Sequence, residues 1–131
     1  MACLDTTFLV DLIRGEKKVL DTLEKLEKSE ENISISSISV MELVMGASIS
    51  NNASIENDKI MKLLESLIIL NFDKDCAVLA GEIQAPLRKK GNLIDLEDIM
   101  IGATAVNQNE ILITKNKKHF ERIPNLEVET Y

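Results

Sequence analysis

The fold is decided by Ile68-Ile69-Leu70-Asn71-Phe72, an apolar run that a single amide interrupts. Such a run is typical of a strand that helices cover on both faces, as happens in parallel sheets. Asp73 follows it directly, and aspartate is a favoured first cap of a helix. We expect that helix to run to about Lys90, with an interruption near Pro86, because proline removes a backbone hydrogen bond. The run therefore predicts one strand-to-helix unit of a layered α/β fold.

Other segments repeat this alternation on both sides of the run. Strand patterns occupy residues 1–4, 33–36 and 111–114, and residues 126–131 have the pattern of an edge strand. Helical spacing of apolar residues covers 6–14, 19–26, 37–49, 60–67 and 96–106, with loops at 48–57 and 91–92. Alternating strands and helices predict a three-layer α/β/α sandwich around a central, mostly parallel sheet of four or five strands. At 131 residues we expect one domain, residues 1–131.

Composition narrows the classes of function. The chain carries 22 acidic against 15 basic residues, a net charge of −7, and only 3% aromatic residues. That balance disfavours a uniformly basic nucleic-acid binder and a module that stacks bases on aromatic rings. No apolar run reaches the roughly 18 residues of a membrane span, and the N-terminus lacks the basic start of a signal peptide. Cys3 and Cys76 show no metal-ligand spacing. We therefore expect a cytoplasmic protein, with no membrane partner and no zinc site.

Acidic residues recur where the predicted fold places a functional edge. Asp5 ends the first strand, Glu42 and Asp98 lie in first turns of helices, and Asn116 follows the strand at 111–114. Ligand sites of parallel sheets form beyond the carboxyl ends of the strands. Grouped carboxylates repel one another, and a divalent cation relieves that repulsion. Mg²⁺ and Mn²⁺ prefer such oxygen ligands and can activate water against a phosphodiester.

Each acidic residue also has a purely structural interpretation. Asp5 could cap the helix at 6–14, and Ser39-x-x-Glu42 has the spacing of a capping box. Asp95-x-x-Asp98 resembles a cap too, and acids in a first turn favour the helix dipole. Both interpretations stay open for each residue taken singly, whereas three acids at one sheet edge favour a metal site.

Four motifs in order resemble one family, the PIN-domain ribonucleases, and specifically the VapC-type toxins of type II toxin–antitoxin pairs. The resemblance covers almost the whole chain. Its motifs are Leu4–Gly15 (LDTTFLVDLIRG), Ile35–Gly46 (ISSISVMELVMG), Asp98–Ala105 (DIMIGATA) and Ile111–Phe120 (ILITKNKKHF), with the tail Ile123–Val128 (IPNLEV).

The resemblance implies a PIN-like fold and an endoribonuclease that depends on Mg²⁺ or Mn²⁺. The family's metal ligands correspond to Asp5, Glu42 and Asp98. The fourth position, often aspartate, falls on Asn116, which keeps an oxygen but loses a charge, so the number of metal ions stays open. The family's small hydroxyl residues correspond to two threonines expected to orient Asp5 and the nearby loop, namely Thr7 and Thr114.

The resemblance also implies two protein partners. One is a cognate antitoxin, which would dock over an apolar groove and block the site, and the other is a second copy of the chain in a homodimer. Six apolar residues could line either surface, although the core is the default expectation for most of them: Val40, Leu43, Val44, Ile60, Leu63 and Leu67.

Local basic clusters give an acidic chain a means of holding RNA. Lys115, Lys117 and Lys118 follow the fourth motif, and we expect them to contact phosphates beside the cleaved bond. A solvated basic turn is the alternative. His119, the single histidine, receives no catalytic role. The alternative function is a catalytically silent PIN module that binds RNA or a protein partner, which Asn116 leaves open.

Overall fold

The computed structural model describes residues 1–131, and its centre is a five-stranded sheet in which every pair of neighbours is parallel. The strand order is β3-β2-β1-β4-β5. Ala2 and Leu4 of β1 pair with Ile33 and Ile35 on one side and with Ile111 and Ile113 on the other. The strands are β1 (Ala2–Leu4), β2 (Ile33–Ser36), β3 (Ile68–Leu70), β4 (Ile111–Ile113) and β5 (Val128–Glu129).

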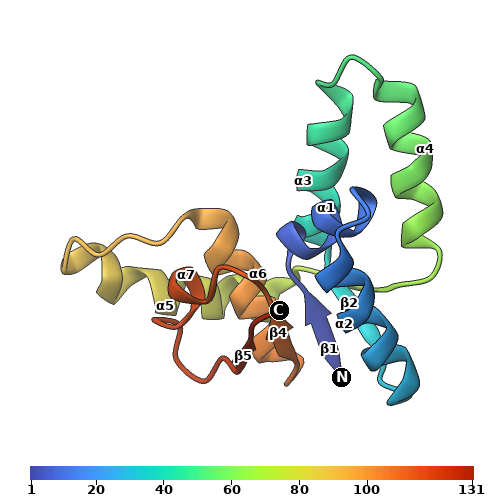
Figure 1. Cartoon of the computed structure of the whole chain (residues 1–131). Coiled ribbons are helices and arrows are strands. Elements are labelled where there is room, and N and C mark those ends of the chain that lie inside the picture. Colours follow the sequence, from blue (N-terminus) through green and yellow to red (C-terminus); the bar gives the residue numbers. More distant parts are fainter.

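Seven helices connect and cover these strands, which confirms the predicted layered α/β fold (Figure 1). Parallel neighbours need crossover connections, and helices provide them. The helices are α1 (Thr6–Ile13), α2 (Lys17–Lys28), α3 (Ser37–Ser48), α4 (Ala53–Leu64), α5 (Lys74–Lys89), α6 (Leu96–Asn107) and α7 (Lys117–Phe120).

Two apolar clusters hold the layers together, and β1 contributes to both. Cys3 packs in the cluster that contains Ile83 of α5 and Ile99 of α6. Ala2 and Leu4, whose side chains point to the opposite face, pack in the cluster that contains residues of α1 to α4. Alternation along a strand sends successive side chains to opposite faces, so the central strand ties both helical layers to the sheet.

The strand β3 differs from the prediction of a strand buried on both faces. It lies at the edge of the sheet and pairs only with β2. Ile68 is 48% exposed and Ile69 37% exposed, while Leu70 is buried. An apolar run indicates that a segment is an extended strand that other segments partly cover. It does not indicate which strands pair with it, because strand order depends on segments far away in the sequence.

Four predicted boundaries were wrong. The expected loop at 48–57 is half helix, because α4 begins at Ala53. Pro86 does not interrupt α5, which continues to Lys89 with the proline exposed. The basic turn is the short helix α7, and the edge strand contains only Val128–Glu129.

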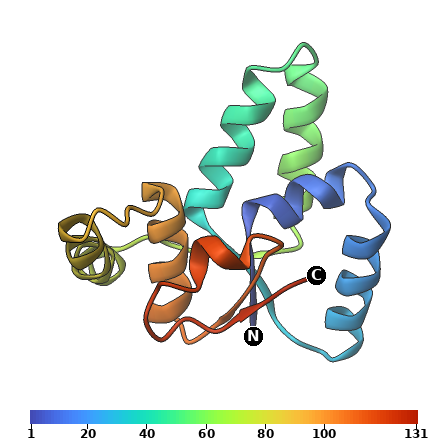
Figure 2. The same cartoon turned by 60° about the vertical axis from the view of Figure 1, so that its left-hand side comes forward.

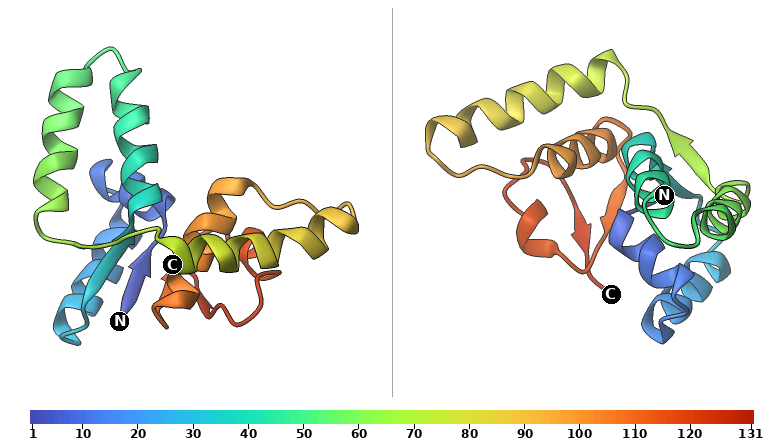
Figure 3. Two further views of the ribbon diagram at one scale, coloured as in Figure 1. Left: turned by 180° about the vertical axis from the view of Figure 1, so that it is seen from behind. Right: turned by 90° about the horizontal axis from the view of Figure 1, so that it is seen from above.

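The helices α3 and α4 form a hairpin that projects beyond the sheet, as the views in Figures 1, 2 and 3 agree. Exposed apolar side chains lie along it, including Met41, Met45 and Ile49 on α3 and its end. Their spacing of four residues places them on one side of the helix. No helix combines the length and apolar character that crossing a membrane requires.

Candidate functional site

Asp5 forms the centre of the candidate site at the carboxyl end of β1. The residue is 3% exposed, and its side chain accepts three hydrogen bonds. Oδ1 accepts from the backbone N–H of Thr6 at 2.8 Å, and Oδ2 accepts from the hydroxyls of Thr7 at 3.0 Å and Thr114 at 2.7 Å. Asp5 is thus the N-cap of α1 and, at the same time, a buried carboxylate fixed in one orientation.

Glu42 reaches the same region from α3. Its Oε1 accepts from the hydroxyl of Thr6 at 2.8 Å, and that hydroxyl is also hydrogen-bonded to Ser39 at 2.9 Å. The capping-box interpretation of Ser39 and Glu42 is wrong, because the N-cap of α3 is Ser36 and Ser39 lies inside the helix. Glu42 is therefore held toward the first turn of α1 and not toward its own helix end.

Asp98 lies in the first turn of α6, beside α7. Its Oδ2 lies 3.3 Å from Nδ1 of His119, and Asp98 makes no other side-chain hydrogen bond. Asp95, the N-cap of α6, forms no side-chain cap bond either, so a reciprocal cap between Asp95 and Asp98 is absent. The carboxylate of Asp98 is 21% exposed and borders the site with few protein partners.

The electrostatics of the site centre on Asp5. The pKa of Asp98 is raised from 3.8 to about 6, chiefly by burial and also by repulsion from Asp5, against the opposing effect of His119. Burial also raises the pKa of Glu42, with Asp5 and Glu97 as further causes, against the hydrogen bond from Thr6. Two carboxylates thus respond to the same buried neighbour, as expected of grouped acids without a cation.

One polar cavity of about 300 Å³ contains the predicted acids. Asn116 borders this cavity from the end of β4, and the hydroxyl of Thr114 accepts its backbone N–H at 3.0 Å. Thr114 therefore links the position of Asn116 to the orientation of Asp5. The lining residues are Asp5, Thr6, Thr7, Val10, Asp11, Arg14, Glu42, Asp98, Lys115 and Asn116.

The three predicted lysines lie beside the acids on the exposed loop and helix after β4. Lys115 borders the acidic cavity and pairs with Asp11 of α1. Lys117 and Lys118 are exposed on α7 and line a neighbouring hollow of about 530 Å³ that contains no apolar residue. Positive charge therefore borders the acidic cavity through Lys115 and continues along the neighbouring hollow through Lys117 and Lys118.

The donor set suits a hard divalent cation. No three acidic, histidine or cysteine side chains are arranged to hold one ion by themselves. Mg²⁺ typically takes one or two carboxylates and keeps several waters. Burial is the main cause of the raised pKa values of Glu42 and Asp98, and repulsion from Asp5, which a cation would relieve, adds to it. The oxygen donors that line the cavity thus suit a divalent ion, which Asp5 and Asp98 would hold with waters completing its coordination.

Several residues that the sequence reasoning missed also contact the site. Thr6 and Ser39 support Glu42, and His119 contacts Asp98. Asp11 holds Lys115 and accepts a hydrogen bond from Tyr131. The paired threonines after Asp5 were a usable signal for Thr6. The contact of Asp11 with residues more than 100 positions away had no local signal.

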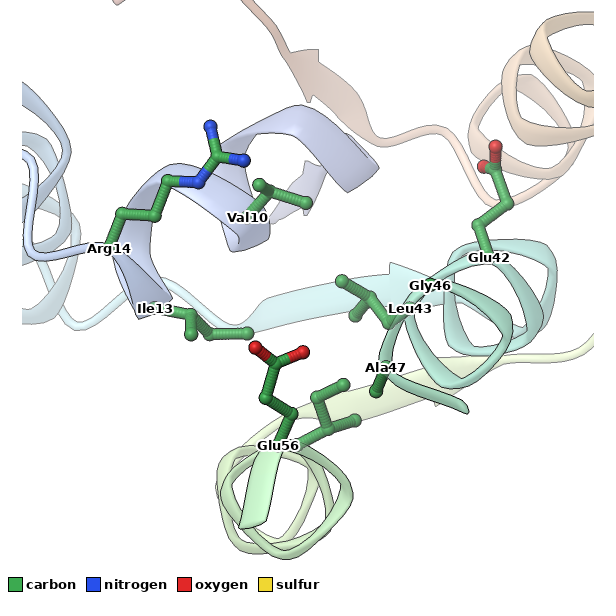
Figure 4. Close-up of a pocket in the computed structure, with 9 residues that line it drawn as sticks. Val10, Ile13, Arg14, Glu42, Leu43, Gly46, Ala47 and Glu56 are labelled. Carbon is green, nitrogen blue, oxygen red and sulfur yellow. The ribbon is translucent and has the colours of Figure 1, made fainter. Parts of the chain in front are cut away.

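An apolar groove of about 340 Å³ runs between α1, α3 and α4 and opens onto the acidic cavity. Figure 4 shows the side chains that line it: the Glu56 carboxylate points toward Ile13, and the Glu42 carboxylate points away from both. Val10, Arg14 and Glu42 border both the groove and the acidic cavity. An apolar segment lying in this groove would therefore reach the acids.

Comparisons with known proteins agree with this fold. The PIN-domain family profile matches residues 2–126. Ribonuclease VapC2 of Rickettsia felis is 36% identical over 98% of this chain and 96% of its own length. The tRNA(fMet)-specific endonuclease VapC of Salmonella typhimurium is 29% identical over the same shares.

Solved structures give the same result in three dimensions. The chain superposes on VapBC2 of Rickettsia felis, crystallised with a DNA fragment from its promoter, with a TM-score of 0.91, 34% identity and coverage of 99% and 98% of the two chains. For the DNA-bound VapBC of Salmonella typhimurium the TM-score is 0.87, with 28% identity and coverage of 98% and 96%. An all-parallel sheet with an acidic cavity at its carboxyl edge, a matching family profile and full-length relatives together place the chain in the PIN-domain family, among the VapC ribonucleases.

Proposed function

We propose that this chain is a divalent-metal-dependent endoribonuclease and the toxin of a type II toxin–antitoxin pair. The observation that carries the proposal is Asp5, a buried carboxylate held by three donors within a cavity that Glu42 and Asp98 also border. Relatives that are 29% to 36% identical over nearly their full length bear the names ribonuclease or endonuclease, which supports RNA as the substrate class.

The proposed metal is Mg²⁺ or Mn²⁺, and Asp5, Asp98 and Glu42 would hold it, the last through water. Asn116 would offer a neutral oxygen. A bound ion of this kind supplies an activated water and stabilises charge on the phosphate. The chain itself would fix the geometry, because Thr7 and Thr114 orient the carboxylate of Asp5 by hydrogen bonds.

The lysines beside the cavity would hold the RNA backbone. Lys115 borders the acidic cavity, and Lys117 and Lys118 line the hollow beside it. Ammonium groups on phosphates position a nucleic acid without reading its sequence. An acidic chain can thus bind RNA locally, because its positive charge is grouped where the backbone would pass.

A cleavage assay tests the proposal. The purified chain is incubated with labelled tRNA and with an unstructured RNA, in EDTA, Mg²⁺ or Mn²⁺. We expect cleavage only with a divalent ion. Asp5→Asn and Asp98→Asn should each reduce the cleavage rate at least about 100-fold, because losing a metal ligand should reduce activity more than losing a residue that supports a ligand. Asp75→Asn is the matched control, since Asp75 also lies in the first turn of a helix but away from the site.

The outcomes separate the two candidate functions. Cleavage that both aspartate variants retain would assign the activity to a contaminant. RNA binding without cleavage in any divalent ion would instead favour the silent PIN module.

The groove between α1, α3 and α4 is the proposed docking site for the antitoxin. Its apolar lining and its opening onto the acids suit a partner segment that blocks the site, and solved relatives are VapBC complexes.

Gly46 lines the groove, and a side chain added at its Cα would meet open space. Gly81 of α5 has the same open space but lies outside the groove. We expect Gly46→Gln to keep cleavage but resist inhibition by the protein encoded beside this gene. Gly81→Gln should be inhibited like the wild type, and equal inhibition of both variants would contradict the groove assignment.

Three further properties are proposed with the function. The chain would form a homodimer, and sedimentation of the wild type against Met45→Glu tests the exposed side of α3 as its surface. Residues 1–131 would form a single PIN domain, as the one sheet between two apolar clusters supports. A cytoplasmic location suits both an RNA substrate and the two buried free cysteines.

A further inference from the structure

We propose that Asp11 and Tyr131 are positioning residues that hold the ammonium group of Lys115 at the wall of the acidic cavity, where it would meet a phosphate of the RNA backbone. The inference rests on the proposed RNA cleavage. It adds an anchored cation to a site whose predicted lysines otherwise lie on exposed chain.

The three side chains meet at one oxygen. Lys115 Nζ donates to Asp11 Oδ2 at 2.9 Å, and the hydroxyl of Tyr131 donates to the same oxygen at 2.9 Å. Asp11 is nearly covered, with a side chain that is 10% exposed, whereas Lys115 keeps 47% of its side chain exposed. The carboxylate thus provides a fixed anchor, and the ammonium group stays accessible to a ligand.

Packing fixes this anchor from behind. The ring of Tyr131 packs edge-on against Phe8, with centroids 4.9 Å apart and an interplanar angle of 76°. Phe8 is fully buried one turn before Asp11 on α1. Because the tyrosine is held by the core, its hydroxyl restrains the Asp11 carboxylate, and that carboxylate in turn restrains the lysine.

The position of Lys115 points to a ligand. The residue borders the same cavity as Asp5, Asp98 and Asn116, and it lies next to Thr114, which orients Asp5. Its ion pair is with Asp11 and not with the carboxylates of the proposed metal centre. Lys115 therefore adds positive charge to the rim without neutralising the acids, as a phosphate next to a metal centre requires.

Asp11 and Tyr131 could instead serve only to tie α1 to the end of the chain, and this structural role predicts a different result from the positioning role. Asp11→Asn keeps an oxygen for Tyr131 and removes one negative charge beside the proposed RNA path. RNA binding should therefore stay as strong or become stronger. Positioning requires that the single-turnover cleavage rate nevertheless falls, by about 10-fold to 100-fold, since small misplacements of this kind have effects of that size.

The experiment measures RNA affinity and single-turnover cleavage for Asp11→Asn, Tyr131→Phe, Lys115→Gln and the double variant Asp11→Asn/Lys115→Gln. Lys115→Gln should slow cleavage and lower the salt slope of RNA binding by about 0.7, the value for one phosphate contact on a single strand. The double variant should be no slower than Lys115→Gln, because residues that act through one group are not additive. Tyr131→Phe keeps the ring on Phe8 and should slow cleavage in the same direction by a smaller factor.

Glu24→Gln is the matched control, because Glu24 also pairs with a lysine at 2.9 Å but on the exposed face of α2. It should cleave like the wild type. A cleaving wild type whose Asp11→Asn variant cleaves equally fast, or slower only in proportion to weaker RNA binding, would overturn the inference and leave the proposed function intact. A wild type that cleaves no RNA in any divalent ion would overturn the proposed function, and this inference with it.

Discussion

Replacing Thr114 by valine should weaken the proposed metal site more than it weakens the fold. The hydroxyl of Thr114 donates to Asp5 Oδ2 at 2.7 Å and accepts from the backbone N–H of Asn116 at 3.0 Å. Valine has nearly the same shape but neither bond. The substitution thus removes one of the three donors that hold Asp5 and releases the start of the loop that carries Asn116.

The expected magnitudes follow from these contacts. A hydrogen bond to a charged group contributes about 1.5–3 kcal/mol, and Asp5 keeps its bonds from Thr6 and Thr7. We therefore expect the free energy of unfolding to fall by about 1.5 kcal/mol, the lower end of that range. Affinity for the metal should fall about 10-fold to 100-fold, as is usual when a residue that orients a ligand is lost.

Two variants isolate the hydroxyl of Thr114. Thr114→Ser keeps it and should retain most of the affinity. Thr104→Val removes an equally buried hydroxyl, which donates to the Met100 carbonyl at 2.7 Å on α6, and it should change stability alone. The assay is a Mn²⁺ titration of RNA cleavage together with urea denaturation in EDTA. A Thr114→Val protein with wild-type Mn²⁺ dependence would refute the role assigned to the hydroxyl.

Three further predictions follow from burial, packing and charge. The pKa of Asp98 is raised from 3.8 to about 6, so the folded chain favours the protonated carboxyl group. The stability that this protonated group contributes is full below about pH 4 and is lost as the pH rises through about 6. Asp98→Asn should therefore stabilise the metal-free fold at pH 7, on the order of 2 kcal/mol, and flatten the pH dependence of urea denaturation; an unchanged profile would contradict the raised pKa. Gly102→Ala would bring a Cβ within 2.5 Å of buried Ile123 and should cost about 1–3 kcal/mol of stability, measured by urea denaturation, with wild-type stability as the contrary result. Lys117→Gln combined with Lys118→Gln should weaken RNA binding and flatten its salt dependence, and identical salt titrations would remove both lysines from the interface.

The sequence predicts the elements of this fold better than their order. Residues 111–113 and 68–70 are both short apolar runs, yet β4 lies between two strands and β3 lies at the edge. An apolar run indicates that neighbouring segments cover a strand, and both of these strands are at least partly covered. Which strands pair is decided by long-range packing of the helices, and no local pattern states it.

The site shows the same division between local and long-range information. Asp5 could be placed because it ends a strand, and strand ends share one edge in a parallel sheet. Thr114 could be expected beside it for the same reason. Asp11 and Tyr131 are 120 positions apart and meet through one hydrogen bond, and Asp98 and His119 meet because α7 packs against α6. Such contacts depend on how the last segment crosses the sheet edge, so composition and spacing could not reveal them.

The pairing of Lys115 explains how the acidic centre stays available for a cation. A free lysine beside Asp5, Glu42 and Asp98 would be drawn to them and would compete with a metal ion. Asp11 instead binds this ammonium group at 2.9 Å, and no lysine or arginine pairs with the three acids. Repulsion from Asp5 therefore persists in the folded chain and adds to burial, the main cause, in raising the pKa values of Glu42 and Asp98. A divalent cation would relieve that repulsion on binding, and Lys115, which is paired with Asp11 but about half exposed, would meet the phosphate.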